Sequence, residues 1–391
     1  MNAITETTLE QWATDSDGPV AVNLKQKLTS VECVEDSDAC IIYPPTYADI
    51  GYNIDTLSNG KKIALVDSIG SQANRMEPVF KSDEIQRDKW LVPQIRIALG
   101  NGKDPTKLSL LDLAHRGADA VVQSSGDLAT GIRKAFSSLR SSGDAGPLCA
   151  IAPTSLVFGV WDSRGGSSEK RPRLVRSVIR AWDVEVLHAA AQFNSVWKEL
   201  DQDQQKALQD EAKKQKKELS TKGLADAPAT FRKVGKAAEA QIRQFRDGSA
   251  NPERRILGGV LVKAGILRDL TVNLVALRGL CASDEDETKA LRKYLLGLAL
   301  IAATTDIDLF LREGCNLRFS GDDQWHSVPR RGNAERIDLT SESAIGAIHA
   351  VAEAGAAHFR KKWPEKMEYI FDIAEAKKLL AAKDDDEESA A

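Results

Sequence analysis

Alternation of apolar and polar residues predicts strands near the N-terminus of the chain. Residues 20–32, VAVNLKQKLTSVE, alternate well enough for a strand that carries Lys25 and Lys27 on one face. Residues 60–68, GKKIALVDS, predict a second short strand that runs into a helix, and the helical period ends near Pro78. This part of the chain is therefore expected to be mixed α and β.

Further along, apolar runs and helical periods alternate with charged segments. Residues 155–161, SLVFGVW, predict an apolar strand that leads into a flexible loop, SRGGSS, and residues 258–280 are also rich in strand formers. Residues 288–303 place apolar side chains on one stripe, which predicts an amphipathic helix. Composition and periodicity alone support the α+β class. The other predicted segments are helical or mixed stretches at 108–119 and 129–139, an exposed charged helix or insertion at 198–219, an irregular stretch at 223–252, and one or two helices at 341–382, interrupted around Pro364.

Length, charge and cysteine content narrow the classes of protein. With 391 residues, 42% of them hydrophobic, the chain can bury a sizeable core. No apolar run reaches the roughly 20 residues of a membrane-spanning helix, and the N-terminus lacks the features of a signal peptide, so we expect a cytoplasmic protein. Five scattered cysteines without CxxC spacing argue against a zinc ribbon or a disulfide framework. The net charge of −4 means that any polyanion must bind in a local groove.

A basic cluster stands out in this acidic chain between residues 161 and 180. Only Asp162 and Glu169 oppose its cations. Guanidinium groups pair bidentately with phosphate oxygens, so the cluster predicts contact with a nucleic-acid backbone rather than with base edges. The alternative is a solvated charge run. The candidate residues are Arg164, Lys170, Arg171, Arg173, Arg176 and Arg180.

A second polar group follows the strand predicted at 60–68. On a helix, Ser71 and Arg75 lie one turn apart on the same side, and Gln72 lies beside them. Such a face can bind a sugar-phosphate chain without reading its sequence. The alternative is a polar helix face that is satisfied by its own protein. The candidate residues are Ser71, Gln72, Asn74 and Arg75.

Catalytic motifs are scarce. The sequence has no HExxH pair, P-loop, GxSxG elbow or GxGxxG after a strand, so we expect no metal and no cofactor. His115 with Arg116 could act as an acid and a phosphate clamp in an RNA-cleaving site, or could be structural. Weaker candidates are Arg330 and Arg331 for phosphate contact, and Trp161, Trp182 and Trp325, which could stack on bases or belong to the core.

Several blocks of the chain, in a fixed order, resemble one protein family. The main matching block is APTSLVFGVWDSRG followed by KRPRLVRSVIRAWDVE. The chain resembles the backbone subunit of type I-G (formerly I-U) CRISPR effector complexes, a branch of the RAMP superfamily. The other matching blocks are IIYPPTYA, LVDSIGSQANRME, LDLAHRGADA, GGVLVKAGILRDLTVNLVALRGL, LRKYLLGLALIAATT and LREGCNLRF.

The resemblance implies an RNA-recognition-motif-like (ferredoxin-like) palm with large insertions that form fingers and a thumb. We expect a single domain of this kind over residues 1–383. Charge and composition predict a charged, irregular insertion at about 198–255 and, because apolar residues are lacking there, a disordered acidic tail at 384–391. The aromatic RNP1 signature of many such folds is absent from the sequence.

The function implied by the resemblance is geometric rather than catalytic. Copies of the protein would bind CRISPR guide RNA, polymerise along it with other subunits of the complex, and leave the bases free to pair with a target DNA strand. Two alternatives stay open. One is an endoribonuclease of the same superfamily that processes precursor guide RNA, and the other is an assembly subunit whose arginines pair with acidic neighbours. Because a related branch of the superfamily cuts target RNA with an aspartate, the resemblance also makes Asp67 and Asp162 candidate nuclease carboxylates.

Overall fold

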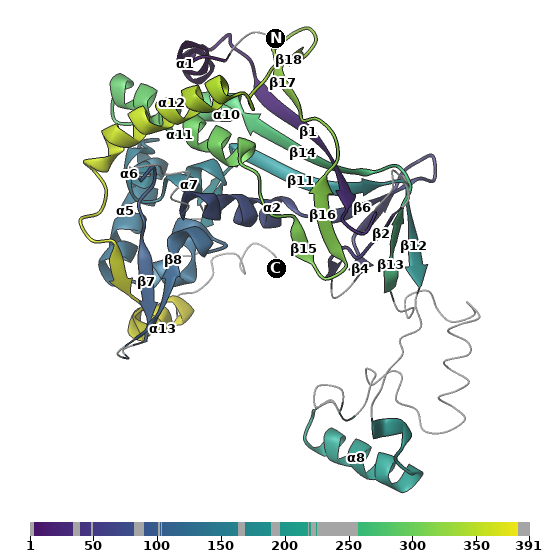
Figure 1. Ribbon diagram of the computed structural model, residues 1–391. Coiled ribbons are helices and arrows are strands. Elements are labelled where there is room, and N and C mark those ends of the chain that lie inside the picture. The colour runs from purple at the N-terminus through teal and green to yellow at the C-terminus, as the bar shows by residue number, and fades with distance from the viewer. Residues whose placement is uncertain are drawn as a thin grey trace.

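The protein is an α+β structure in which helices pack against one face of a large antiparallel sheet (Figure 1). The computed structural model describes residues 4–33, 40–47, 50–81, 90–162 apart from 101 and 103, 169–188, 196–217, 219, 224 and 257–381. The predicted α+β class is confirmed.

The main sheet has nine strands within the described residues, and most of them follow the order β15-β16-β1-β14-β11-β6-β5. β17 pairs with the first half of β1, beside β16, and β18 pairs with β17. The strands are β1 (Ala21–Ser30), β5 (Ile54–Thr56), β6 (Lys62–Asp67), β11 (Val175–Trp182), β14 (Ile266–Asn273), β15 (Phe310–Arg312), β16 (Cys315–Phe319), β17 (Gln324–Val328) and β18 (Glu335–Arg336).

Four central strands form two interleaved units. β1 and β11 both pair antiparallel with β14, so they run parallel to each other with β14 between them. In the same way, β14 and β16 both pair antiparallel with β1 and run parallel on either side of it. The chain passes from β14 to β16 through α10 (Leu274–Arg278) and α11 (Glu285–Thr304). This interleaving fixes which side chains lie in a row across the sheet.

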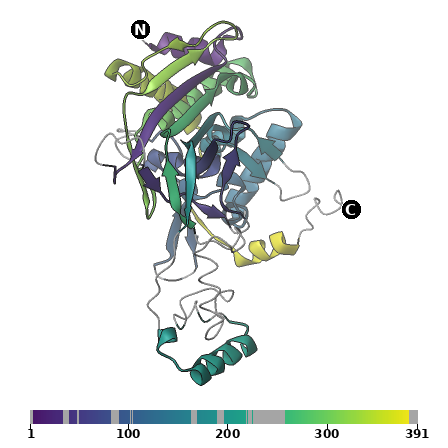
Figure 2. The same cartoon turned by 90° about the vertical axis from the view of Figure 1, so that its right-hand side faces the viewer.

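Alternation along the strands gives the sheet a covered face and an open face. In β1 the even-numbered residues from Val22 to Leu28 are buried, whereas Lys25 and Lys27 are exposed, as predicted. α1 (Glu6–Thr14), α2 (Ile69–Met76), α11 and α12 (Glu342–Arg360) lie on the covered side. Figure 2 shows the strands of the open face in front of these helices.

The helical layer is held close by two glycines. A Cβ atom on Gly297 of α11 would lie 2.6 Å from the Cα of Ala352, and one on Gly355 of α12 would lie 2.6 Å from the Cα of Tyr294. All residues of α11 from Tyr294 to Ala303 are buried. The predicted helix is therefore confirmed, but the single apolar stripe is wrong for its second half, because the sheet and the neighbouring helices enclose this half on all sides.

Smaller elements complete the fold. β12 (Val184–His188), β13 (Leu257–Val262) and β2 (Cys40–Ile42) form a sheet beyond the end of the main one, and β19 (Glu368–Ile370), β7 (Arg96–Leu99) and β8 (Thr106–Ser109) form another. Two hairpins are β9 (Val160–Asp162) with β10 (Glu169–Arg171) and β3 (Thr46–Tyr47) with β4 (Gly51–Tyr52). The remaining helices are η1 (Glu77–Lys81), η2 (Leu110–Asp112), η3 (Arg116–Ala118), α4 (Ala120–Gln123), α5 (Gly126–Ser141), α6 (Gly146–Ile151), α7 (Pro153–Val157), η4 (Val196–Lys198), α8 (Gln202–Lys214) and α13 (Ile373–Ala381).

The strand predicted at 155–161 is wrong for most of its length. α7 occupies its first part, and only β9 is strand. Pro153 suits the first turn of a helix, and the next four residues are all buried, so packing outweighs their strand propensity. The predicted strand and helix at 60–78, the exposed helix within 198–219 and the interrupted helices at 341–382 are confirmed. The SRGGSS loop, nearly all of 223–252 and the acidic tail lie outside the described residues.

Candidate nucleic-acid interface

α2 is positioned by the end of β6 and by its own N-terminal cap. The hydroxyl of Ser68 accepts a hydrogen bond from the backbone N–H of Ser71 at 3.2 Å, which satisfies one of the free donors of the first turn. Ser71 is half-buried. The polar residues of the helix point in different directions: Gln72 and Arg75 both reach Asp67, whereas Asn74 contacts Arg116.

Gln72 is fully buried in a polar network on the covered side of the sheet. Its Nε2 donates to the carboxylate of Asp67 at 2.7 Å, and its Oε1 accepts from the hydroxyl of Ser177 at 2.7 Å and from Nε of Arg268 at 3.1 Å. Arg268 is 1% exposed, and burial lowers its pKa to about 10 against the opposing effect of nearby aspartates. Gln72 therefore joins α2 to three strands.

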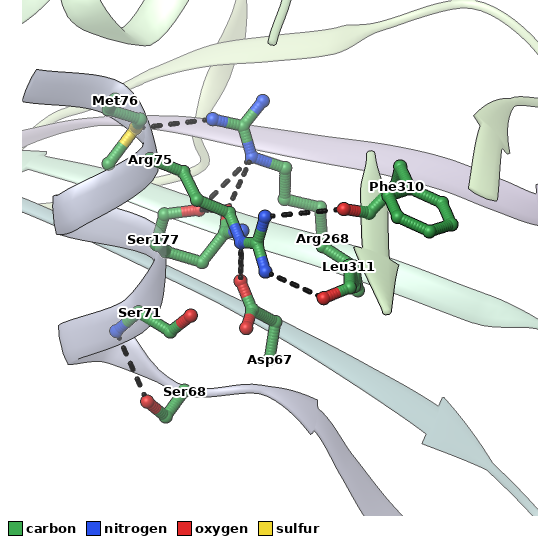
Figure 3. Close-up of polar contacts among 10 residues, drawn as sticks. Asp67, Ser68, Ser71, Arg75, Met76, Ser177, Arg268, Phe310 and Leu311 are labelled. Carbon is green, nitrogen blue, oxygen red and sulfur yellow. Dashed lines mark hydrogen bonds and ion pairs between the residues drawn. The ribbon is translucent and has the colours of Figure 1, made fainter. Parts of the chain in front are cut away.

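Arg75 ties α2 to the end of the sheet. Its Nε lies 3.2 Å from Asp67, and its Nη2 donates to the carbonyl of Leu311 at 3.1 Å (Figure 3). A further donor lies 3.4 Å from the carbonyl of Phe310. For Gln72 and Arg75 the geometry matches the alternative in which polar helix residues are satisfied by their own protein. RNA contact by these two side chains stays a prediction.

Arg116 is buried against Glu77 at the other end of α2. The Arg116 Nε lies 2.6 Å from the Glu77 carboxylate, and the two side chains are 4% and 1% exposed. Burial raises the pKa of Glu77 to about 7, although the Arg116 charge acts to lower it. Arg116 also has a positive φ of 53°, which is strained for a residue with a side chain. Arg116 is thus a buried anchor, whereas its neighbour His115 is exposed.

The fold brings Asn74, Arg116 and Arg173 together from three separate sequence blocks. One Arg116 nitrogen donates to Asn74 Oδ1 and another to the carbonyl of Gly159, both at 3.2 Å. A Cβ atom on Gly159, whose φ is +80°, would lie 2.7 Å from the Cγ of Arg173. Asn74 and Arg173 are exposed. We call Asn74, Arg116 and Arg173 the α2-end cluster.

Arg173 carries the unneutralised charge of the α2-end cluster. Burial of part of its side chain, and then the like charge of Arg116, lower its pKa. Within the described residues its side chain has no ion pair, in contrast to Arg116, which Glu77 neutralises. A guanidinium held beside another cation without a carboxylate of its own favours an anion as its partner.

The rest of the basic stretch divides between two surfaces. Lys170 is exposed on the β9–β10 hairpin, and a guanidinium nitrogen of Arg171 donates to the carbonyl of Leu139 at 3.2 Å. Arg176 and Arg180 belong to β11 and point to the open face of the sheet. Arg164 lies outside the described residues. One run of sequence therefore supplies cations to both sides of the sheet.

The late arginines are separate from the α2-end cluster. Arg330 and Arg331 are exposed in the loop after β17, as predicted for a loop tip. Arg330 donates to the carbonyl of Ser16 at 2.8 Å, which holds it near the end of α1. Their contact with RNA stays a prediction.

The tryptophans separate clearly by burial. Trp325 is 2% exposed and belongs to the core, and Trp182 is half-buried. Trp161 is 57% exposed on the β9–β10 hairpin, directly opposite Lys170 in the register. An exposed indole beside a lysine can stack on a base while the ammonium contacts phosphate. The sequence allows either a core or a stacking role for Trp161, and its exposure excludes the core.

The candidate catalytic residues do not gather into one site. Asp67 is buried and bonded to Gln72 and Arg75, and His115 is exposed on a loop. The side chain of Asp162 lies outside what the structure describes. Among the described residues, no group of three or more His, Cys, Asp or Glu could hold a metal ion.

Comparison with known families agrees with this part of the chain. Residues 25–186 match the sequence model of a family described as CRISPR-associated protein GSU0053. The match spans less than half of the chain, but it includes the second half of β1, α2, the Arg116 loop and the whole basic stretch. The chain is thus identified as a CRISPR-associated protein. No curated protein matches it. In the described part of the chain, no helix has the length and apolar character needed to cross a membrane.

Proposed function

We propose that this CRISPR-associated protein is the guide-RNA-binding backbone subunit of a cytoplasmic type I-G interference complex. The observation that carries the proposal is the α2-end cluster, which gathers Asn74, Arg116 and Arg173 from three blocks of the sequence. All three blocks lie within the residues that match the CRISPR-associated family.

The chemistry of the cluster suits a sugar-phosphate chain. The Arg173 guanidinium can pair with phosphate, and the Asn74 amide nitrogen can donate outward because Oδ1 is already occupied by Arg116. Trp161 and Lys170 on the nearby hairpin add a stacking surface and a further charge. These groups recognise backbone and π-face, so binding should depend little on the RNA sequence.

The sheet topology supports the palm that the resemblance implies. Two interleaved β-α-β units, β1 to β11 and β14 to β16, are the arrangement of ferredoxin-like folds. The segments between β1 and β11 and between β12 and β13 would then be the insertions that form fingers and thumb.

The larger assembly belongs to the same proposal. Copies of the chain would bind successive stretches of the guide through head-to-tail contacts, which are open and can form a filament with other subunits. The bases would remain free to pair with a target DNA strand, so specificity lies in Watson–Crick pairing. The subunit itself would cleave neither strand. The internal contacts of Asp67 support a non-catalytic role, because they engage the carboxylate of one candidate nuclease residue.

Replacement of Arg173 by alanine tests the proposed site. We expect weaker binding of fluorescein-labelled single-stranded RNA in anisotropy titrations, and a salt dependence that is less steep by about 0.7 for the lost phosphate contact. Arg173→Lys keeps the charge and should retain the slope. Arg133→Ala, an exposed arginine on α5, is the matched control. Equal affinities for wild type, Arg173→Ala and Arg133→Ala would refute the assignment of this site.

A further inference from the structure

A cleft opens on the other side of the sheet from the α2-end cluster. It has a volume of about 610 Å³ and lies where β1, β14 and β16 meet the turn between β13 and β14. Its charged lining residues are Lys27, Lys263 and Arg318, and Thr29 lies between the first and the last. We call these four residues the open-face cleft.

The strand register places three of these side chains on one patch of the open face. Thr29 of β1 lies directly opposite Arg318 of β16, and Lys27 is two residues before Thr29 on the same face. Neighbouring strands are about 4.8 Å apart and residues i and i+2 about 6.7 Å apart, so the two cations spring from backbone positions about 8 Å from each other. Both can reach one anionic chain.

Two of the three cations of the cleft are not neutralised by the described part of the protein. In the part of the chain that the structure describes, the side chains of Lys27 and Arg318 are exposed and form no ion pair or hydrogen bond. The third cation, Lys263, is paired with the exposed Glu185 at 2.7 Å. An ordinary solvent-facing sheet would pair its charges across strands. Lys25, one row along the same face, is paired in this way with Asp269.

We propose that the open-face cleft binds the phosphodiester backbone of a nucleic-acid strand. The cleft size fits a ligand-binding site, and its cations, the Thr29 hydroxyl and the glycines Gly265 and Gly321 suit close approach by phosphate oxygens. Arg180 extends the surface, because it lies in one row with Leu267 and Lys27 across β11, β14 and β1. The choice of nucleic acid over another polyanion rests on the proposed function, but the site is distinct from the α2-end cluster.

The consequence is a subunit with nucleic-acid contacts on both faces of its central sheet. One face would hold the guide through Arg173, and the other would hold a second stretch of guide or the complementary strand. The shared chemistry is a phosphate backbone. To tell guide RNA from a complementary DNA strand, labelled single-stranded RNA and labelled single-stranded DNA of equal length are each titrated alone. Each titration is then repeated with the other nucleic acid present as an unlabelled competitor.

The test is a Lys27→Ala/Arg318→Ala double variant. We expect its affinity for at least one of the two probes to fall about tenfold or more, and the salt slope to decrease by about 1.4, or 0.7 for each lost contact with a single strand. Lys27→Arg/Arg318→Lys keeps both charges and should keep the slope. An Arg133→Ala/Lys134→Ala variant removes two exposed cations from α5 and is the matched control.

The outcomes also separate this inference from the proposed function. If only the open-face variant loses affinity, the open-face cleft stands and the Arg173 site fails. If only Arg173→Ala loses affinity, the proposed function keeps its site and the open-face inference is overturned. A slope that is unchanged relative to the Arg133→Ala/Lys134→Ala control, for both RNA and DNA, also overturns it. Circular dichroism melting checks that each surface variant is folded.

Discussion

Replacement of Arg116 by methionine should destabilise the protein by an amount that grows with pH. Arg116 and Glu77 form a buried ion pair at 2.6 Å, with side chains 4% and 1% exposed. Methionine keeps much of the side-chain length and packs flexibly, so the substitution removes the charge and the hydrogen bonds while retaining most apolar contacts. The experiment therefore measures mainly the polar contribution of Arg116.

Two losses set the magnitude. The hydrogen bonds from Arg116 to Asn74 and to the Gly159 carbonyl, both 3.2 Å long, disappear, at about 1 kcal/mol each. Glu77 is also left without its cation, and breaking a buried pair costs about 3–5 kcal/mol while the remaining group stays charged. Protonation of Glu77 relieves part of this cost, so we expect about 2 kcal/mol at pH 6 and about 3–5 kcal/mol at pH 9.

The direction of the pH effect follows from the raised pKa of Glu77. Its carboxyl titrates at a pKa of about 7 in the folded protein against an ordinary value of 4.5. Between pH 4.5 and pH 7 the folded state binds more protons than the unfolded state. The stabilising contribution of the protonated Glu77 carboxyl is therefore fully present below about pH 4.5 and is lost as pH rises through 7. Arg116 is the main group that lowers this pKa, so its removal raises the pKa of Glu77 further. The free energy of unfolding of the variant then keeps falling above pH 7, by about 1.4 kcal/mol per pH unit.

Urea unfolding followed by circular dichroism at pH 6 to 9 measures these free energies. Glu77→Gln should remove the pH dependence assigned to the carboxyl, and Arg116→Met/Glu77→Gln should unfold with a cost nearly independent of pH. A cost for Arg116→Met below about 1 kcal/mol throughout, or one that shrinks as pH rises, would refute the reasoning about a buried charged pair.

Three further substitutions test the fold and the interface. Gly159→Ala should destabilise by about 1–3 kcal/mol in urea unfolding, since its φ is +80° and its Cβ would meet Arg173; no loss would show that this turn can relax. Gly355→Ala should cost a similar about 1–3 kcal/mol by forcing α12 away from Tyr294, and a melting temperature equal to wild type would contradict the close helix contact. Trp161→Ala should leave stability unchanged but weaken single-stranded RNA binding by about 1–3 kcal/mol in anisotropy titrations, and unchanged affinity would remove stacking from the proposed site.

Local patterns predicted several elements because local forces dominate there. Alternation in β1 sets which lysines face solvent, and the strand-to-helix junction at Ser68 is capped by that residue's own hydroxyl. The charged surface of α8 likewise follows from its composition. The strand expected at 155–161 failed because burial of α7 between distant segments decided its conformation, and no window of sequence contains those segments.

The candidate site was predicted in its parts but not in its arrangement. Asn74, Arg116 and Arg173 were all candidates, yet their meeting depends on contacts between residues far apart in the chain. Sequence reasoning did not foresee that Arg116 would be buried against Glu77, because a glutamate three residues after Asn74 gives no sign of its partner. It also missed the open-face cleft, since Lys27 and Arg318 become neighbours only through the pairing of β1 with β16. The alternation that put Lys27 on the solvent side was the available signal.

The most direct test of guide binding is purification of the protein with a co-expressed CRISPR guide RNA, followed by the ratio of absorbance at nucleic-acid and protein wavelengths across a sizing column. The account predicts that RNA elutes with the protein in a particle larger than one chain, that ribonuclease treatment breaks this particle into single subunits, and that Arg173→Ala lowers the RNA content. A protein that elutes free of RNA, or that keeps the same size after ribonuclease treatment, would contradict it.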